Sequence, residues 1–541
     1  MCRASAVPRT RLGSLARMSE LMRDPAAIER LRTALEKAQY TVDGCLEAMG
    51  ATAYAALGRN ESVAASRAVA RDDSPVATLT KLFVLQEDVD RAAAEAALPL
   101  EDAEAGGLVA RDRTDDTVRA LVDIRPYGEV GAPVPAGGPR SAAADQSDVD
   151  WWLVSDLGAG LVTGRNAPMR PDYVLGVGGA STTLAQLTVR EQVERSLDVG
   201  TGCGVQALHL ARHSTRVTAT DLNLRALDFA RLTSALSLGA AEAERIDLRG
   251  GSLFEPVEGE LYDLIVSNPP FVISPESAAG RGRFTYRDAG LPGDELCRRF
   301  LEQAPAHLAE DGYCHVLANW LHVAGQDWRE RLAPWVRGTG CDAWVVQREF
   351  QDPAEYAELW LRDSGDHNSP RYVERYQAYL DYFAEHRIEG VAFGWIILRN
   401  TGTEQPTIRL EELTGQIEQP LGAYVPGWFA RHTFLADTED EQLLGTALRV
   451  APGVVLEQIA EPDAGGWSPT ATRLRQTSGL HATGEIDPVG IAVVGAADGE
   501  RPLGDLLERI AGQFGIEPAA LRSGALDAVR SLVEEGFLTL S

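Results

Sequence analysis

The sequence predicts an α/β protein built on a doubly wound, mostly parallel sheet, with a smaller module on each side. From Leu197 to Asn400, short apolar runs alternate with runs of helical spacing, which is typical of strands that alternate with helices. A helical stretch that ends in β-like runs comes before this region, and Gly- and Pro-punctuated acidic segments follow it. The length of 541 residues exceeds what one hydrophobic core organises, so about two to four domains are expected.

Residues 1–23 are predicted to form a disordered extension. The first seventeen residues hold four arginines and no acid, and they lack the apolar run of a secretion signal. A targeting peptide is the alternative interpretation, and Met18 rather than Met1 could be the true start.

Residues 24–128 are predicted to form a helical, winged-helix-like domain. The helical runs cover 26–49 (two helices), 61–69 and 74–98, and the β-like runs cover 108–111 and 117–125. Such a module can read DNA, but residues 87–104 hold seven acids against the single Arg91. A recognition helix that faces phosphates has the opposite charge, so the pattern favours a packing or protein-docking role.

Residues 129–150, rich in Pro, Gly, Ala and Ser, are predicted to be a linker. The domain at 151–400 then begins with an ordered strand at Trp151. Its main strands are expected at 196–199, 216–220, 247–250, 263–267, 313–319, 344–349 and 391–399. Its helices are expected to begin near Val205, Leu224, Asp294, Gln326, Pro353 and Arg371.

A glycine-rich turn follows the first of these strands, in Leu197-Asp-Val-Gly-Thr-Gly-Cys-Gly204. Glycine allows the backbone to take positive φ values and lets a ligand approach it closely. The next strand ends in Asp221, and a carboxylate there can accept hydrogen bonds from ribose hydroxyls. The alternative role for Asp221 is to cap the following helix. Asp198, inside the first strand, could anchor an ammonium group.

A second motif, Asn268-Pro-Pro-Phe271, follows the strand at 262–267. An amide nitrogen is a poor nucleophile because its lone pair is delocalised. Two acceptors that grip its N–H bonds would aim that lone pair, and the two prolines would stiffen the backbone that carries them. By itself, Asn-Pro-Pro could simply end a strand.

Together, the two motifs resemble the class I S-adenosylmethionine-dependent methyltransferases that carry an Asn-Pro-Pro-aromatic signature. The resemblance implies a seven-stranded doubly wound sheet whose last strand inserts antiparallel beside its neighbour. It implies an acceptor site in which Asn268 and the Pro269 carbonyl hold a planar NH2 group, beside Pro270 and a stacking Phe271. It implies a site for S-adenosyl-L-methionine made by Asp198, Gly200, Thr201, Gly202, Gly204, Asp221, Leu222, Ser252, Leu253 and Asn268. Related enzymes often carry an aspartate, which contacts the adenine amine, where this chain has Ser252. In this chain, Ser252 or a backbone group is expected to make that contact.

The residues around Asp172 to Trp320 are similar to the HemK-type glutamine methyltransferases, through Phe271-Val-Ile-Ser-Pro-Glu276 and Gly290-Leu-Pro-Gly-Asp-Glu-Leu296. This resemblance implies a protein glutamine amide as the acceptor, for example in a translation factor. Related enzymes that methylate base amines of rRNA, tRNA or DNA share the motif, so RNA or DNA stays an alternative. The net charge of −28 disfavours a nucleic acid, which basic surfaces usually bind. A non-catalytic module that binds the cofactor or a small molecule is the alternative of another class.

Apolar runs and cysteine spacing indicate the compartment in which the protein works. The sequence contains no run of about 18 apolar residues, so no membrane span is expected. The six scattered cysteines show neither metal-ligand spacing nor a disulfide framework. A cytoplasmic protein without a metal is therefore expected. Residues 401–541 are predicted to be a small α+β accessory domain, with a strand at Gly490–Gly495 and two or three helices over 502–540. The sequence leaves the oligomeric state open.

Overall fold

A computed structural model describes residues 24–112, 114–129, 149–158, 170–275, 291–363 and 369–540. The predicted extension at 1–23 and most of the predicted linker (130–148) lie outside these ranges. The chain divides into two compact units, one made of Met1–Ala185 with Arg190–Glu404, the other of Gln186–Val189 with Gln405–Ser541.

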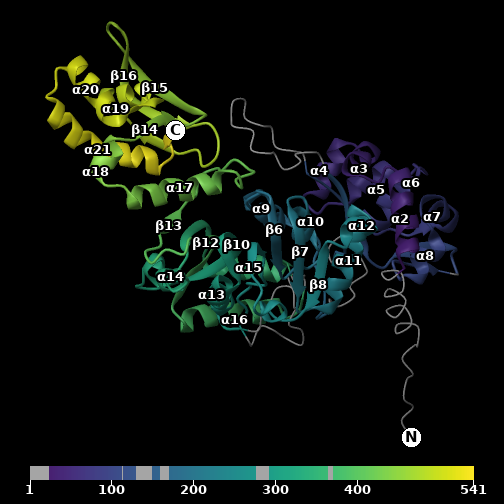
Figure 1. Ribbon diagram of the computed structural model, residues 1–541. Coiled ribbons are helices and arrows are strands. Elements are labelled where there is room, and N and C mark those ends of the chain that lie inside the picture. The colour runs from purple at the N-terminus through teal and green to yellow at the C-terminus, as the bar shows by residue number, and fades with distance from the viewer. Residues whose placement is uncertain are drawn as a thin grey trace. The chain divides into compact units, whose positions relative to one another are not determined.

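The central sheet has eight strands in the order β13-β11-β12-β10-β9-β6-β7-β8 (Figure 1). They are β6 (Val193–Val199), β7 (Ser214–Asp221), β8 (Ile246–Gly250), β9 (Tyr262–Ser267), β10 (Leu308–Val323), β11 (Asp342–Gln351), β12 (Ile388–Arg399) and β13 (Ile408–Glu412). The seven predicted strands are all present. The predicted count of seven is wrong by one, because β13, beyond the predicted end of the domain, extends the same sheet.

Strand directions follow the expected topology. The run β8-β7-β6-β9-β10 is parallel, whereas β12 is antiparallel to both β10 and β11. Parallel strands of this kind are covered on both faces and are apolar along their length. In β9, for example, Leu264, Ile265 and Val266 are all buried.

The helices of this domain start close to the predicted positions. They are α9 (Gly179–Leu187), α10 (Val205–Ala211), α11 (Leu224–Leu238), α12 (Ala240–Ala243), α13 (Glu295–Gln303), α14 (Trp328–Arg337), α15 (Pro353–Asp363) and α16 (Tyr372–Glu385), with the short 3-10 turns η2 (Glu255–Val257) and η3 (Ala304–His307). The pair α15 and α16 forms a hairpin between β11 and β12.

The amino-terminal module consists of short helices and a three-stranded sheet of order β1-β3-β2. Its elements are α2 (Pro25–Lys37), α3 (Val42–Met49), α4 (Ala51–Leu57), α5 (Val63–Val69), α6 (Pro75–Leu79), the π-helical turn η1 (Thr80–Val84), β1 (Val89–Asp90), α7 (Arg91–Ala97), α8 (Leu100–Ala105), β2 (Val109–Asp112) and β3 (Thr117–Ala120). The continuous helical run predicted for 74–98 is wrong. Gln86 takes a φ of 58°, which ends the helix, and Val89 and Asp90 pair with β3 instead.

A two-stranded ribbon ties this module to the sheet domain. Strand β4 (Asp123–Glu129) pairs along its length with β5 (Val149–Ser155), so the last two residues of the predicted linker belong to a strand. On one side, the indole Nε1 of Trp152 donates to the carbonyl of Tyr40 at 2.6 Å. On the other side, the backbone N–H groups of Trp152 and Val154 donate to Ser237 and Thr233 of α11, at 3.0 and 2.9 Å.

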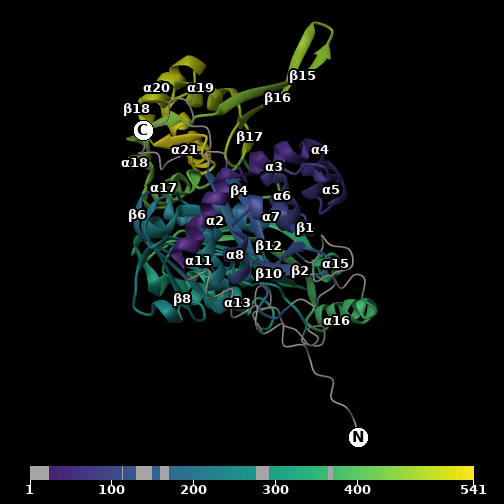
Figure 2. The same ribbon diagram turned by 90° about the vertical axis from the view of Figure 1, so that its right-hand side faces the viewer.

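The second unit holds a helical core and a long hairpin, β15–β16, which extends away from the helices of this unit (Figure 2). Its elements after β13 are α17 (Tyr424–Asp437), α18 (Asp440–Leu444), β14 (Ala447–Val450), β15 (Val454–Asp463), β16 (Gly466–Gln476), β17 (Thr483–Glu485), α19 (Pro488–Ala496), β18 (Asp498–Pro502), α20 (Leu503–Phe514), α21 (Pro518–Glu534) and β19 (Leu538–Leu540).

The strand predicted at Gly490–Gly495 is wrong, because this segment is part of α19. The side chain of Asp487 caps the helix by accepting from the N–H of Gly490, and Pro488 occupies the first turn, where proline is favoured. The helices predicted over 502–540 are present as α20 and α21. Among the helices of the described ranges, none has the length and apolar content needed to cross a membrane.

Candidate active site

The predicted site residues lie at the carboxyl ends of four neighbouring parallel strands, β9, β6, β7 and β8. In the sheet register, Val199 lies opposite Thr220 of β7 and Ser267 of β9, and Asp221 lies opposite Gly250 of β8. The glycine turn, Asp221, the Ser252 turn and Asn268 are therefore side by side at the carboxyl edge of the sheet. In open α/β sheets, this edge is where ligands bind.

The glycine turn takes a shape that residues with side chains rarely adopt. Gly200, Gly202 and Gly204 have φ values of 78°, 57° and 90°. The N–H groups of Gly200 and Thr201 both donate to the carbonyl of Thr220 at 2.9 Å. A Cβ on Gly200 or Gly202 would point into open space, with nothing within 4 Å, whereas a Cβ on Gly204 would lie 3.1 Å from Ala230 of α11. The first two glycines thus leave room for a ligand, and the third lets α10 and α11 approach each other.

Asp198 is a buried carboxylate at the base of this turn. Its relative exposure is 1%, and within the described part of the chain neither carboxylate oxygen has a hydrogen-bond partner. Burial raises the pKa of Asp198 from 3.8 to about 7. The nearby Thr201 hydroxyl and the Ala207 N–H oppose this rise, and the nearby Asp221 adds to it. A buried carboxylate without a partner is costly, so the site suits a cationic ligand group.

Asp221 connects the end of β7 to the glycine turn. Its Oδ2 accepts from the N–H of Gly202 at 2.9 Å, and its Oδ1 accepts from the N–H of Asn223 at 2.7 Å. The alternative role of Asp221 as helix cap is wrong, because Asn223 caps α11 by accepting from the N–H of Arg225. Burial raises the pKa of Asp221, and the two N–H donors oppose that rise.

Leu222, Ser252 and Leu253 lie farther along the same edge. Leu222 is 64% exposed. Ser252 and Leu253 are partly buried, and Leu253 has a φ of 46°. A positive φ is uncommon for a residue with a side chain, and it is found preferentially at ligand-binding sites.

The Asn268-Pro-Pro-Phe271 segment leaves β9 directly beside the glycine turn. The hydroxyl of Ser267, the last residue of β9, donates to the carbonyl of Val199 at 2.8 Å. Pro269 is buried, whereas Asn268, Pro270 and Phe271 are partly exposed. The Phe271 ring meets Phe393 of β12 edge to face, with centroids 6.4 Å apart.

The structure adds a partly buried ion pair beside the site that sequence patterns did not reveal. Arg225 of α11 binds both carboxylate oxygens of Asp156, one of them at 2.6 Å. The same carboxylate accepts from the N–H of Val174 at 2.8 Å, and Asn223 donates to the carbonyl of Asp172 at 3.0 Å. These bonds hold the segment before α9 near the start of α11. Asp156 and Arg225 are 69 residues apart along the chain, and no motif links them.

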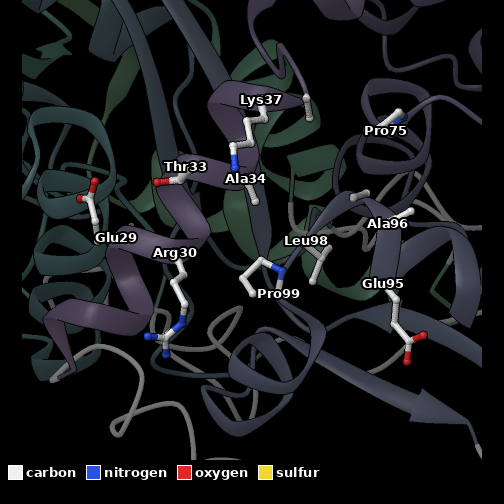
Figure 3. Close-up of a pocket in the computed structure, with 12 residues that line it drawn as sticks. Glu29, Arg30, Thr33, Ala34, Lys37, Pro75, Glu95, Ala96, Leu98 and Pro99 are labelled. Carbon is white, nitrogen blue, oxygen red and sulfur yellow. The ribbon is translucent and has the colours of Figure 1, made fainter.

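A separate pocket lies in the amino-terminal module (Figure 3). It has a volume of about 440 Å³ and is lined by α2, Pro75, the end of α7 and the turn that follows α7. Arg30 at its rim pairs with Asp102 at 2.7 and 2.9 Å. None of the predicted site residues lines this pocket. Among all residues that the structure describes, no group of three or more His, Cys, Asp or Glu side chains is arranged to hold a metal ion.

The chain has detectable similarity to known proteins in three regions. Residues 177–326 match a family model described as methyltransferase small domain, and residues 37–121 and 426–540 match two models described as domains of unknown function. The curated relatives include a ribosomal protein uL3 glutamine methyltransferase from Bradyrhizobium diazoefficiens, which is 36% identical over 129 residues (22% of this chain and 39% of the relative). A release factor glutamine methyltransferase from Xylella fastidiosa is 36% identical over 147 residues (24% of this chain and 52% of the relative). The chain thus spans about two fifths to one half of these relatives.

Proposed function

We propose that the protein is an S-adenosylmethionine-dependent N-methyltransferase that acts on the side-chain amide of a protein glutamine. This proposal rests mainly on the register of β6 and β9, which sets the Asn268-Pro-Pro-Phe loop beside the glycine turn. At the base of that turn lies the buried carboxylate of Asp198, whose oxygens accept no hydrogen bond within the described residues. Two glutamine methyltransferases among the relatives support the choice of acceptor, with the similarity concentrated in this domain.

The residues at the carboxyl edge fit S-adenosyl-L-methionine. When bound, this cofactor supplies an electrophilic methyl group on a cationic sulfur. Asp198 would pair with its ammonium group, and the backbone of Gly200, Thr201, Gly202 and Gly204 would follow its methionine part. Asp221, which already accepts two N–H bonds, has further lone pairs for ribose hydroxyls. Leu222, Ser252 and Leu253 would flank the adenine.

The acceptor amide would be held by the loop after β9. The Asn268 side-chain oxygen and the Pro269 carbonyl would each accept one N–H bond of the amide, which aims its lone pair. Pro270 keeps the backbone stiff, so that these acceptors need little reorganisation. Phe271 would stack on the planar amide. The released proton can pass to water, because the nitrogen is acidic once it is alkylated.

Labelled methyl transfer tests this function. The protein would be incubated with methyl-labelled S-adenosylmethionine in four separate reactions. Each reaction would contain one purified acceptor: release factor, ribosomal protein uL3, ribosomal RNA or transfer RNA. We expect protease-sensitive label in a protein acceptor, and much less label with the Asn268→Ala variant. Label in RNA alone would replace the amide by a base amine as the acceptor, and absence of cofactor binding in calorimetry would contradict an enzymatic role.

A further inference from the structure

We propose that Asn319, Tyr356 and Tyr379 are positioning residues that hold the segment Phe271–Ser274 and thereby orient Asn268. The role rests on the proposed function, because it concerns the loop that would grip the acceptor amide. Two of these residues belong to the α15–α16 hairpin, which lies beyond the residues 177–326 matched by the methyltransferase model.

Three side chains bond to successive parts of this segment. The Nδ2 of Asn319, on β10, donates to the carbonyl of Phe271 at 2.6 Å. The hydroxyl of Tyr356, on α15, accepts from the N–H of Ile273 at 2.8 Å. The hydroxyls of Tyr379, on α16, and Ser274 are 3.2 Å apart. The segment is thus fixed from three separate elements.

All three holding side chains are in the protein interior. Asn319 and Tyr356 have 0% relative exposure and Tyr379 has 3%, and Ile273 itself has 1%. A buried N–H or carbonyl that loses its partner pays the full cost of desolvation, because water cannot replace the bond. These bonds therefore select one position of the loop strongly.

Aromatic packing joins the hairpin to the acceptor loop. Tyr356 stacks on Phe393 with centroids 6.0 Å apart, and Phe393 meets Phe271. Asn319 lies directly opposite Phe393 in the β10–β12 register, so both side chains are on the same face of the sheet. The Asn319 hydrogen bond and the ring contact with Phe393 thus both act on Phe271.

A shift of Phe271 would be transmitted to Asn268. Only Pro269 and Pro270 separate the two residues, and their fixed φ angles leave little freedom to absorb a displacement. Misplacement of a reacting group by about 1 Å can lower the rate by about a hundredfold. The α15–α16 hairpin therefore helps to set the position of Asn268 relative to the substrate amide.

The test compares two Tyr→Phe variants of the same hairpin in the full chain. Tyr356→Phe removes the acceptor for Ile273 while it keeps the ring on Phe393. The matched control is Tyr376→Phe, because the Tyr376 hydroxyl donates to Glu358 at 3.1 Å on the exposed side of the helices. We expect Tyr356→Phe to lower kcat by about tenfold, with the KM for the acceptor and the Kd for S-adenosylmethionine unchanged. The control should match the wild type.

Two further measurements separate positioning from a general loss of structure. In the Asn268→Ala background, Tyr356→Phe should lower turnover by less than about twofold, because residues that act through one another are not additive. Hydrogen exchange of the peptide that contains Ile273 should be faster in Tyr356→Phe than in Tyr376→Phe or in the wild type, whether or not an acceptor is known.

Several results would overturn the inference. These are equal exchange in the two variants, equal turnover, full additivity with Asn268→Ala, or a fall in cofactor affinity as large as the fall in kcat. If the wild-type protein methylates no amide, the proposed function fails. The exchange comparison then decides alone whether Tyr356 fixes the loop.

Discussion

Asn268 has the sharpest expected effect of any single residue. In the proposed mechanism, Asn268→Ala removes one acceptor for the substrate amide, whereas the buried carboxylate Asp198 and the turn Gly200–Gly204 stay intact. We expect turnover to fall by about a hundredfold or more, as for the loss of other preorganised hydrogen-bonding groups. Labelled-methyl transfer measures the turnover, and calorimetry should show nearly unchanged cofactor affinity. Asp221→Ala is the matched contrast and should weaken cofactor binding instead; an equal loss of cofactor affinity in both variants would contradict the assigned roles.

Asp198 should make cofactor binding depend on pH near neutrality. Burial raises its pKa to about 7 in the free protein, so below pH 7 the carboxyl is mostly protonated and neutral. A cationic ligand group favours the ionised form, so affinity should increase as pH rises through about 7 and level off above it. Each unit of pH below 7 should weaken binding by up to about tenfold. Titration calorimetry from pH 5.5 to 8.5 would measure this, and Asp198→Asn should give a weak, flat profile. A sloping profile in that variant would assign the titration to another group.

Residues of the site differ in how well the sequence revealed them. Asp198 and Asp221 lie near the ends of strands, the glycines and Asn268 directly follow strands, and the pattern of apolar runs located those strands. Asn319 and Tyr356 gave no such signal, because they bond to residues 48 and 83 positions away. Only the tertiary fold brings such pairs together, and an isolated Asn or Tyr in an apolar segment is indistinguishable from an ordinary core residue.

At the scale of elements, the close approach of α10 and α11 depends on Gly204. Its φ is 90°, and an added Cβ would lie 3.1 Å from both the Cα and the Cβ of Ala230. We expect Gly204→Ala to lower the free energy of unfolding by about 2–3 kcal/mol, from left-handed backbone strain and the contact with α11. Chemical denaturation measures this loss. Gly178→Ala is the control, since nothing lies within 4 Å of its added Cβ. Equal stability of the two variants would mean that α10 and α11 can separate without cost.

The elements that the sequence missed were those decided by tertiary context. The central strands were predicted because burial on both faces gives continuous apolar runs that a glycine or a polar residue ends. Residues 490–495 also form an apolar run, but the cap by Asp487 starts a helix there. Gln86 interrupts a helical pattern without a Gly or Pro. Strand β13 is short and none of its five residues is buried, which is too weak a pattern to distinguish from a loop.

At the scale of the whole molecule, the amino-terminal module should be needed for a stable sheet domain. A shortened chain that begins at Val149 would lose β4, the partner of β5, and the Tyr40 carbonyl that binds Trp152. Trp151 and Trp152, each 5% exposed in the full chain, would become exposed to solvent. We expect a melting temperature lower by at least about 5 °C and a tendency to aggregate, as measured by calorimetry and gel filtration. A shortened chain with unchanged melting temperature and cofactor affinity would mean that the ribbon only tethers an independent module.

The predicted division into domains at 24–128, 151–400 and 401–541 stays a prediction, and the residues up to Glu404 group into one compact unit apart from Gln186–Val189. Composition shifts marked the ends of the alternating region, and the family models at 37–121, 177–326 and 426–540 fall within the three predicted domains. The sequence predicted a strand at Trp151–Ser155 that packs against the next domain. It did not reveal α11 as the partner, because that contact is made by backbone N–H groups and small hydroxyl side chains. Such contacts leave no apolar or charge pattern.

The position of the transferred methyl group decides whether the protein methylates the side-chain amide of a glutamine. After reaction with S-adenosylmethionine, the acceptor protein would be digested and analysed by tandem mass spectrometry. We expect one added methyl group on the side-chain nitrogen of a glutamine, present with the wild-type protein and strongly reduced with Asn268→Ala. A methyl group on a nucleobase amine, or on a glutamine to the same extent with both proteins, would contradict this expectation.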